Sequence, residues 1–411
     1  MNLARLLRGF LATGAKAILV LAFLFGLAGP ARSRQSESSN QAAASESSAP
    51  LSDRTPAQEK PSSASDADPS AMPRMIIDMT PGDVQLEPHP EREAGKLSPW
   101  VKLGTVSLST RYNFVQNSAG SVNSSQGQYQ AVIKAAFRFD SGSRYTMEAG
   151  LFPGNRFSSG WNGSGWGSGD FRTNLYLKQL YFDAKPVTGL ELQYGGLYFN
   201  QGASTEITGY DYDAYLAGER IRLTRPANFF FDEISITYAY VNAADPPSIS
   251  KRFHRLQQSN YHQFLVAKNV GERLLLSADY TSQSGVQTVR QALRLEIREI
   301  RLVDFFHFEN YQVANPNAGY GFAAYGEKKL HTKLSLGGGY AQHDRPGLYS
   351  DRFAAGKRIF VNVQLELTNE FSISTSYTQA IRNASESNPR TRLDVALNYD
   401  LLRTLRRAKV L

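Results

Sequence analysis

Apolar and polar residues alternate along successive segments of the chain between Lys102 and Leu401. Gln128–Asp140 is an example, because its odd positions are Tyr, Ala, Ile, Ala, Phe and Phe, while its even positions include Gln, Lys, Arg and Asp. Successive side chains of a β-strand point to opposite faces, so this period of two predicts a strand with one apolar and one charged face. Lys357–Leu367 and Arg392–Tyr399 repeat the pattern.

The connectors between these segments alternate between short and long. The candidate short turns are Asp140–Ser143, Ala184–Thr188, Arg225–Phe230, Asn269–Glu272, Glu299–Arg301, Glu327–Lys329 and Thr368–Glu370. The connectors between them, mostly longer, are Gln116–Gly127, Phe152–Asp170, Asn200–Tyr212, Asn242–Gln258, Ser282–Gln287, Ala314–Ala318, His343–Ala354 and Arg382–Pro389. This rhythm is typical of an antiparallel up-and-down β-barrel in an outer membrane, with about sixteen strands and a range of about 14 to 18. Both ends of the barrel are then expected on the side of the short turns.

Alternation by itself also fits a soluble antiparallel sheet with one wet face. Two features favour a membrane barrel. Aromatic residues stand at segment ends, as do Tyr129 and Phe139, where an interfacial girdle would place them. Segments of about nine to eleven residues also match a tilted crossing of the hydrocarbon layer. We therefore predict an all-β transmembrane barrel, with a soluble sandwich as the alternative.

The residues before the barrel predict an export signal and a leader. Arg5, Arg8 and Lys16 precede the apolar run Ala17–Leu27, and small residues follow, as in a signal peptide. We expect a signal peptide over residues 1–33, a disordered Ser/Ala/Pro-rich periplasmic leader over 34–99 and the barrel over 100–411. The alternative for the first segment is a retained anchor. Met75–Leu86 is an apolar island in the leader. We consider that it rests near the barrel mouth, or that it plugs the lumen or docks on a periplasmic partner.

Composition narrows the chemistry. The chain has no cysteine, so neither disulfides nor cysteine-based zinc sites are expected. Residues 100–411 hold 35 Lys and Arg against 26 Asp and Glu, a net charge of +9 (35 − 26). This excess fits a basic lumen or contact with anionic lipid headgroups. The basic residues are spread over alternate positions of many strands, so nucleic-acid binding is not expected. No cofactor is predicted.

The polar face of the segments supplies the candidate pore lining. Its basic members are Lys134, Arg138, Arg144, Arg172, Arg290, Arg294, Arg298, Lys333 and Arg358, and its acidic members are Glu148, Glu191, Glu296 and Glu366. Arg290, Arg294 and Arg298 share one face of one segment, and such a ladder would favour anions. The alternative is that these arginines pair with carboxylates across the wall and only fill a polar interior.

The connector Phe152–Asp170 is rich in glycine and holds two tryptophans. We consider it a candidate constriction loop acting through Trp161, Trp166 and Asp170. The alternative is a surface loop whose tryptophans touch lipopolysaccharide. The acidic stretch Glu206–Asp213 has oxygen ligands suited to a hard cation, but such loops are usually only solvated, and we predict no metal site.

An outer-membrane enzyme would need a nucleophile and a base near the external rim. His254 and His343 fall in external connectors, and no recognisable nucleophile motif accompanies them. We predict that the protein is not an enzyme.

The stretch Leu177–Ser204 (LKQLYFDAKPVTGLELQYGGLYFNQGAS) resembles the strand–turn–strand repeat of bacterial porins and porin-like channels. There, a basic residue followed by Gln-x-Tyr-x-acid leads through a proline-containing turn into a Leu-rich strand with glycine. The resemblance covers about thirty residues specifically and the rest only in pattern. It implies a diffusion channel or exporter of the outer membrane. The sequence lacks an obvious acidic, glycine-rich third-loop motif of the general porins, which leaves trimerisation and pore size open.

These observations predict an outer-membrane channel for passive diffusion of small hydrophilic solutes, leaning toward anions, in a Gram-negative bacterium. The alternative is an exporter or surface-binding barrel for anionic polysaccharide. Expected partners are outer-membrane lipid, lipopolysaccharide and the barrel-assembly machinery, with a homo-oligomer left open. Tyr399 would serve as an internal assembly signal, with the basic tail after it hanging in the periplasm.

Overall fold

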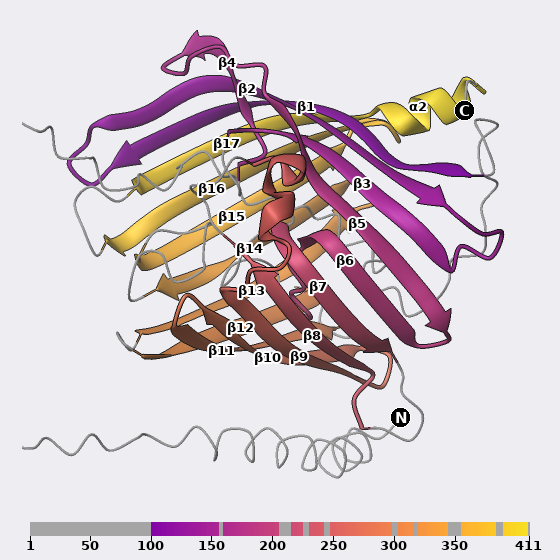
Figure 1. Ribbon diagram of the computed structural model, residues 1–411. Helices are drawn as coiled ribbons and strands as arrows, with labels where there is room; N and C mark the ends of the chain where they lie inside the picture. Colours follow the sequence, from indigo (N-terminus) through magenta and orange to yellow (C-terminus); the bar gives the residue numbers. More distant parts are fainter. Residues whose placement is uncertain are drawn as a thin grey trace, which may run out of the picture. The chain divides into compact units, whose positions relative to one another are not determined.

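The computed structural model describes residues 100–155, 159–204, 215–224, 230–241, 247–297, 303–315, 319–343, 355–383 and 389–409. These residues form one antiparallel sheet with two short helices (Figure 1). The first strands are β1 (Val101–Asn117), β2 (Val122–Arg138), β3 (Tyr145–Pro153), β4 (Asn162–Gly167), β5 (Leu175–Val187), β6 (Leu190–Tyr198), β7 (Tyr215–Thr224) and β8 (Glu233–Tyr240). The later strands are β9 (Tyr261–Val270), β10 (Leu274–Gln283), β11 (Val286–Glu296), β12 (Phe305–Asn315), β13 (Gly319–His331), β14 (Leu334–His343), β15 (Gly356–Glu366), β16 (Phe371–Asn383) and β17 (Pro389–Asp400).

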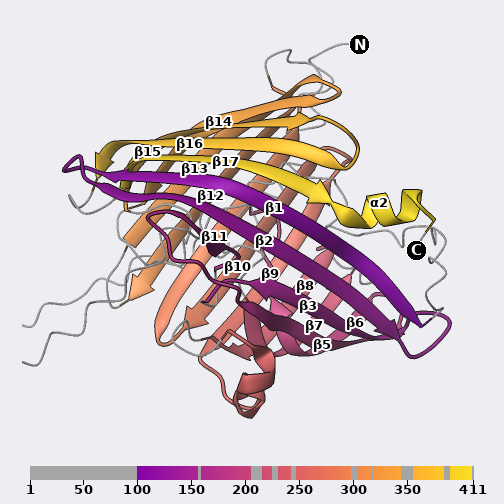
Figure 2. The same ribbon diagram turned by 90° about the horizontal axis from the view of Figure 1, so that it is seen from above.

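The sheet closes on itself as a barrel. Each wall strand pairs with its neighbours in the chain, and β1 pairs with both β2 and β17, so no edge remains (Figure 2). β4 stands apart, because its only pairing is with β2, while β3 pairs directly with β5. The wall therefore has sixteen strands, the 17 of the sheet less β4. The predicted all-β barrel of about sixteen antiparallel strands is confirmed.

The predicted alternation decides which face each side chain occupies. In β15, Ile359 and Val361 are 45% and 43% exposed, whereas the residues that alternate with them, Arg358, Phe360 and Asn362, are buried. A barrel that turns apolar side chains outward and polar side chains inward is inverted relative to a soluble protein. This inversion is expected where the outside is hydrocarbon rather than water.

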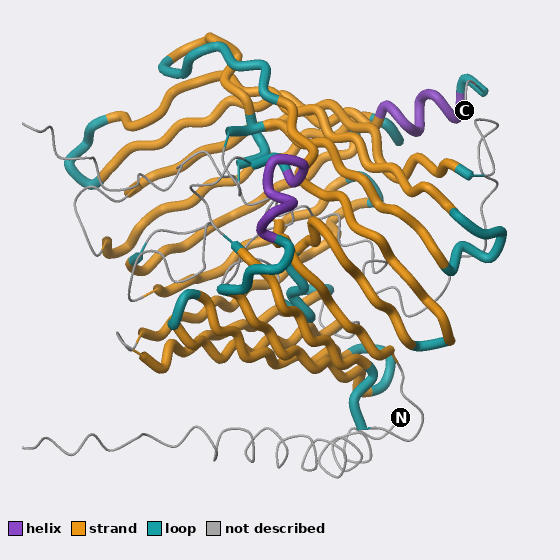
Figure 3. Tube along the Cα trace, viewed as in Figure 1, coloured by secondary structure: helices purple, strands orange, loops and turns teal. Residues whose placement is uncertain are grey.

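The two ends of the barrel differ in their connectors (Figure 3). At one end the chain turns through short segments such as Thr188–Gly189 and Gly271–Arg273, and β1 begins and β17 ends there. We call this the turn end and the opposite end the loop end. The prediction that both ends of the barrel lie with the short turns is confirmed.

Several predicted connectors were placed wrongly. Residues 184–187 of the predicted turn Ala184–Thr188 belong to β5, and the turn comes at residues 188–189. Glu327–Lys329 lies within β13, and the turn comes at residues 332–333. Residues 116–127 are mostly strand, because β1 and β2 each run for 17 residues and only residues 118–121 join them. The connector over residues 152–170 contains β4. In the last three cases polar or glycine residues continue a strand, because a neighbouring strand provides the partners for their backbone hydrogen bonds.

The segment after β17 folds as a helix, α2 (Leu401–Arg407), and does not hang free as predicted. The Asp400 side chain caps α2 by accepting from the backbone N–H of Arg403. Arg406 donates to the carbonyl of Leu103 in β1, and Arg407 pairs with Glu370 at 2.8 Å. α2 therefore ties together the two strands that close the barrel and a neighbouring turn. Neither helix in the described ranges is long and apolar enough to span a membrane.

Candidate functional site

The inner face of the barrel is the candidate site, because buried polar side chains concentrate there. Two connectors from the loop end cover parts of this face. One follows β3 and the other follows β6. The residues that they contact are the natural candidates for a narrowing of the interior.

The connector after β3 enters the interior before it returns to the wall as β4. Trp161 is buried, and its ring lies 4.2 Å from the Arg111 guanidinium of β1. Gln130 donates to the carbonyl of Gly160 at 2.7 Å, and Lys178 donates to the carbonyl of Ser159. Three wall strands thus hold this connector against the inner face through cationic and amide donors.

The connector after β6 crosses the inner face on the other side. Asn200 donates to Glu233 of β8 at 3.1 Å, and its carbonyl accepts from Gln263 of β9 at 2.8 Å. The backbone N–H of Ala203 donates to Ser277 of β10 at 2.8 Å, and Ser204 donates to Glu309 of β12. We call residues Phe199–Ser204 the inner strap. The sequence pattern missed it, because its residues read as an ordinary polar loop.

A pair of glycines bends the wall toward the inner strap. Gln193 of β6 pairs with Arg220 of β7, and Tyr198 pairs with Tyr215, so Arg220 and Tyr198 lie five residues apart in register. On straight strands that separation would be about 16 Å, more than a side chain can span. The Arg220 guanidinium nevertheless lies 4.8 Å from the Tyr198 ring and donates to its carbonyl. Both strands must therefore bend between these positions.

Gly195 and Gly218 face each other at this bend. Gly195 has a φ of +134°, a conformation that residues with a Cβ rarely adopt. Arg220 also donates to Thr237 and Gln193, which are buried on the inner face. The bend therefore directs the upper parts of β6 and β7 inward and positions the start of the inner strap.

A group of arginines lies on the inner face of β15, β17 and β1. Arg111 and Arg392 share one carboxylate, Asp394, at 3.9 and 2.6 Å. Arg358 donates to the carbonyl of Pro389 and to Asn383. Asn113 is a further donor to Asp394, at 2.6 Å. We call Arg111, Arg358 and Arg392 the basic arc, which carries three positive charges against the one carboxylate named here.

A more acidic region lies on β3, β5, β6 and β8 toward the turn end. Glu191 lies 3.5 Å from Arg222 and 4.0 Å from Lys185. Arg222 also pairs with Glu233 at 2.8 Å, and Lys185 pairs with Asp183 at 2.9 Å. The inner face is thus not uniformly basic, since its charges are grouped by sign.

The arginine ladder predicted on β11 is neutralised at Arg290. Arg290 is buried and makes two hydrogen bonds to Asp279 of β10, at 2.9 and 2.5 Å. The Arg294 guanidinium lies 4.8 Å from the Phe305 ring. Arg298 lies outside the described residues. Pairing across the wall is therefore real for Arg290, although its partner is an aspartate of the adjacent strand and not one of the predicted glutamates.

The other predicted pore-lining residues divide between the inner face and the rim. Lys134 is on the inner face, with its Nζ 5.5 Å from the Phe152 ring, and Arg358 belongs to the basic arc. Glu148 accepts from Thr146 at 3.1 Å. Half-buried positions are held by Arg138, Glu148, Glu191 and Glu296, whereas Arg144, Arg172, Lys333, Glu366 and Asp170 are exposed. The predicted lining left out four basic residues of the inner face, namely Arg111, Lys178, Arg220 and Arg392. Arg111, Arg220 and Arg392 follow the parity rule, whereas Lys178 lies at a register shift in β5 that parity does not predict.

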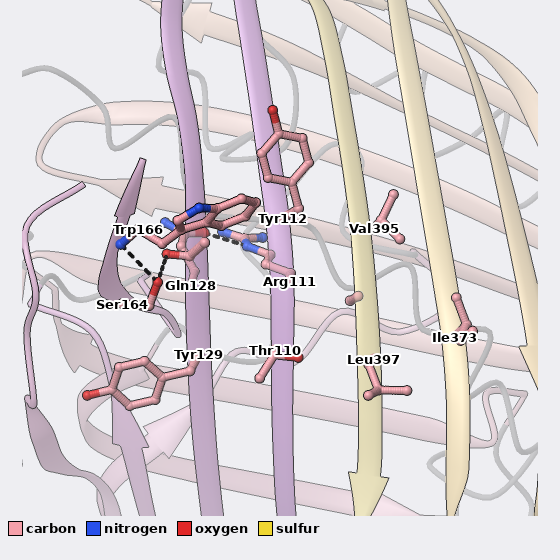
Figure 4. Close-up of a pocket in the computed structure, with 12 residues that line it drawn as sticks. Thr110, Arg111, Tyr112, Gln128, Tyr129, Ser164, Trp166, Ile373, Val395 and Leu397 are labelled. Carbon is pink, nitrogen blue, oxygen red and sulfur yellow. Dashed lines mark hydrogen bonds between the residues drawn. The ribbon is translucent and has the colours of Figure 1, made fainter. Parts of the chain in front are cut away.

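The two tryptophans of the predicted constriction loop lie on opposite faces of the wall. Trp161 is inside and 6% exposed, whereas Trp166 of β4 is 64% exposed and its ring lies 5.5 Å from that of Tyr112. Figure 4 shows Trp166 lying across β2 beside Tyr112, at a groove of about 490 Å³ that Val395 and Leu397 also line. Val395 and Leu397 belong to the outward apolar face. Only Trp161 therefore lies where a constriction could use it.

This difference predicts the response of the tryptophans to quenchers. The chain has three tryptophans, so two substitutions leave one reporter. With Trp100 and Trp161 changed to Phe, the fluorescence of Trp166 should be strongly quenched by lipids brominated on the acyl chain. With Trp100 and Trp166 changed to Phe, the same lipids should leave Trp161 largely unquenched. Equal quenching of both reporters would contradict the placement of the two rings.

The described residues provide little support for a catalytic site or a metal site. Ser259 lies 2.6 Å from Nε2 of His262, but the described residues provide no carboxylate bonded to the second nitrogen of this ring. The His262 ring packs instead at 4.7 Å from that of Tyr238. Among the described residues no group of three or more His, Asp or Glu side chains could hold a metal ion. The acidic stretch at residues 206–213 lies outside the described residues.

Comparisons with known proteins bear on the fold. No protein-family model matches the chain, and no curated protein sequence matches it. An OmpF structure from Salmonella typhi, a complex with daunomycin, superposes with a TM-score of 0.50 at 12% identity, covering 73% of this chain and 98% of that chain. A triple mutant of the Rhodopseudomonas blastica porin gives 0.47 at 12% identity, with 73% and 99% covered. OprB of Pseudomonas putida at low pH gives 0.45 at 9%, with 73% and 92% covered. Only the first reaches a level that bears on the fold, and it shows a porin-like β-barrel.

Proposed function

We propose that this porin-like barrel is an outer-membrane channel for passive diffusion of small hydrophilic solutes, with a preference for anions. The observation that supports it most directly is the combination of a charged inner face with two connectors held against it. The basic arc adjoins one connector, since Trp161 packs on Arg111. A fixed cluster of positive charge in a narrowed aqueous path raises the local anion concentration.

The outward face supports a location in the outer membrane. Its exposed side chains are apolar along the strands, with aromatic rings such as Phe139 and Tyr145 near the turn end and Tyr238 and Tyr320 near the loop end. Two aromatic girdles around an apolar band are the pattern of an outer-membrane barrel. In this orientation the turn end faces the periplasm. Export by a signal peptide over residues 1–33 and a leader over 34–99 belong to the same proposal, and both lie outside the described residues.

Two partner classes follow from this location. Trp166 and Phe171 expose large aromatic surfaces on the outside of the wall, which supports self-association or lipid contact there. Tyr399 stacks on Phe371 at 4.4 Å beside the closing strands, a position that suits an internal signal for the barrel-assembly machinery.

The alternative, an exporter or surface-binding barrel for anionic polysaccharide, has weaker support. Sugar stacking needs an accessible aromatic face, and Trp161 has its ring occupied by Arg111. Trp166 is accessible but lies on the outward face. Among the described residues, the basic arc is the feature that would best serve this function.

Planar-bilayer recording of the full chain tests the proposed channel. We expect stable open conductance, and a reversal potential in a KCl gradient that gives a chloride-to-potassium permeability ratio above one. A barrel that inserts but never conducts would rule out the channel. A ratio below one would remove the anion preference while leaving diffusion in place.

A further inference from the structure

A short helix lies on the outward side of the wall at the loop end. This helix, η1 (Ile249–Arg255), belongs to the connector between β8 and β9, and it lies in front of β5, β6 and β7 in Figure 1 and outside the wall in Figure 2. Gly196 of β6 shares the outward face with Tyr194, which is 46% exposed, because residues two apart on a strand point the same way. A Cβ on Gly196 would lie 2.7 Å from the side chain of Ile249. The helix therefore covers the outward face of the upper part of β6.

Arginine side chains hold η1 on this face. Arg252 is 0% exposed, and its guanidinium lies 4.9 Å from the Tyr215 ring of β7 and 5.6 Å from the Tyr240 ring of β8. The Arg255 guanidinium lies 5.0 Å from the same Tyr240 ring. A contact between a guanidinium and an aromatic face is stronger when it is shielded from water, as it is at Arg252. Two rings on adjacent wall strands therefore fix the position of η1.

The same wall strands lead to the inner strap. Tyr215 belongs to a buried apolar cluster that includes Leu197, Phe199 and Tyr261. Phe199 is the first residue of the inner strap, and its ring meets that of Tyr261 edge-on at 5.3 Å. β6 runs into the inner strap without an intervening residue, just beyond the bend at Gly195. The end of β6 therefore contacts η1 on the outward side and continues into the inner strap on the inner side of the wall.

We propose that η1 positions the inner strap, so that a helix outside the wall sets the width of the path inside it. Glycine has the widest range of backbone conformations, so Gly195 permits the bend of β6 without enforcing it. Contacts on both sides of the strand must then keep the bend, and η1 supplies those on the outward side. Arg252 is a positioning residue, because it acts through Tyr215 and the buried cluster. The placement of the inner strap does not depend on conduction, whereas its effect on current rests on the proposed function.

The chain contains no cysteine, so one introduced cysteine reports on the inner strap. Ala203→Cys places it at a position that is 6% exposed, where a charged methanethiosulfonate reagent should label the full chain in detergent slowly. Adding Arg252→Ala should speed this labelling by about tenfold, because two cation–π contacts are lost and the inner strap is released. Lys251→Ala is the matched control, since it removes an exposed cation from the same helix, and it should leave the rate unchanged.

A second reporter separates release of the inner strap from a general loosening of the barrel. Ser159→Cys lies in the connector after β3, at a position that is 1% exposed, and its labelling should stay slow with and without Arg252→Ala. Tyr240→Leu provides a second way to release η1 if Arg252→Ala does not fold. It removes a ring under the helix while leaving the buried cluster in place, and it should also speed labelling at residue 203.

Three labelling outcomes would overturn the proposal. These are an unchanged rate at residue 203 in the variants that release η1, an equal rise with Lys251→Ala, and an equal rise at residue 159. In planar bilayers, Arg252→Ala should also pass a larger single-channel current than Lys251→Ala, and equal currents would contradict a role in setting the width of the path. If no variant conducts, the proposed function fails, while the labelling rates still decide whether η1 positions the inner strap.

Discussion

Replacing Arg111, Arg358 and Arg392 together with glutamine should shift the proposed anion preference of the channel toward cations. These side chains carry three charges on neighbouring parts of the inner face, and Arg111 and Arg392 share the carboxylate of Asp394. One unit charge at about 4 Å is worth about 1 kcal/mol in water, which corresponds to about a fivefold change in local ion concentration. We expect the chloride-to-potassium permeability ratio to fall by about fivefold or more, measured from reversal potentials.

The variant Arg144→Gln/Arg172→Gln/Lys333→Gln is the matched control. It also removes three positive charges, but all three residues are exposed at the rim or in a connector. Its permeability ratio should stay close to that of the unmodified chain. If the control shifted the ratio as much as the basic-arc variant did, selectivity would depend on overall charge and not on the basic arc.

Gly195→Ala should lower the free energy of unfolding by about 3 kcal/mol, because the new Cβ meets a strained backbone and a clash together. Gly195 has a φ of +134°, and a Cβ there would lie 2.3 Å from the carbonyl oxygen of Leu180. Gly218→Ala should have a similar effect, since its Cβ would lie 2.3 Å from the carbonyl oxygen of Tyr238. Urea unfolding of the barrel in detergent measures both changes.

Gly285→Ala is the control for this prediction. Gly285 also has a positive φ, of +85°, but a Cβ there would meet nothing within 4 Å. The expected loss is therefore about 1 kcal/mol, the cost of the left-handed conformation alone. Equal losses in Gly195→Ala and Gly285→Ala, with little loss in Gly218→Ala, would show that the positive φ, and not the close approach of β6 and β7 to their neighbours, sets the cost.

The barrel could be predicted from the sequence, because the alternation of apolar and polar side chains is visible within each strand by itself. Ile359, Val361 and their neighbours reveal an apolar face regardless of what pairs with them, and the same holds for most of the sixteen wall strands. Strand ends were harder to predict. Ser124 and Asn113 look like loop residues, yet they lie in 17-residue strands and bond to each other on the buried face. That these residues belong to strands becomes clear only from the strand that pairs with them, and the local sequence pattern does not identify that strand.

The interior was predicted less well, because it depends on which connectors fold inward. Trp161 and Trp166 lie five residues apart, and nothing in their local sequence indicates that one packs on Arg111 and the other on the outer surface. The inner strap has no hydrophobic pattern, since its contacts to Ser277 and Glu309 are hydrogen bonds between residues distant in sequence. Pairings such as Arg290 with Asp279 likewise follow from strand register, which parity alone does not fix.

The position of α2 has a consequence for biogenesis. Every wall strand precedes α2 in the chain, and α2 grips both β1 and the turn before β16. If translation terminated just before α2, the released polypeptide would lack the contacts that α2 makes across the β1–β17 junction. In such a product the β1–β17 ladder alone would close the barrel, and we expect proteases to digest its last strand more readily.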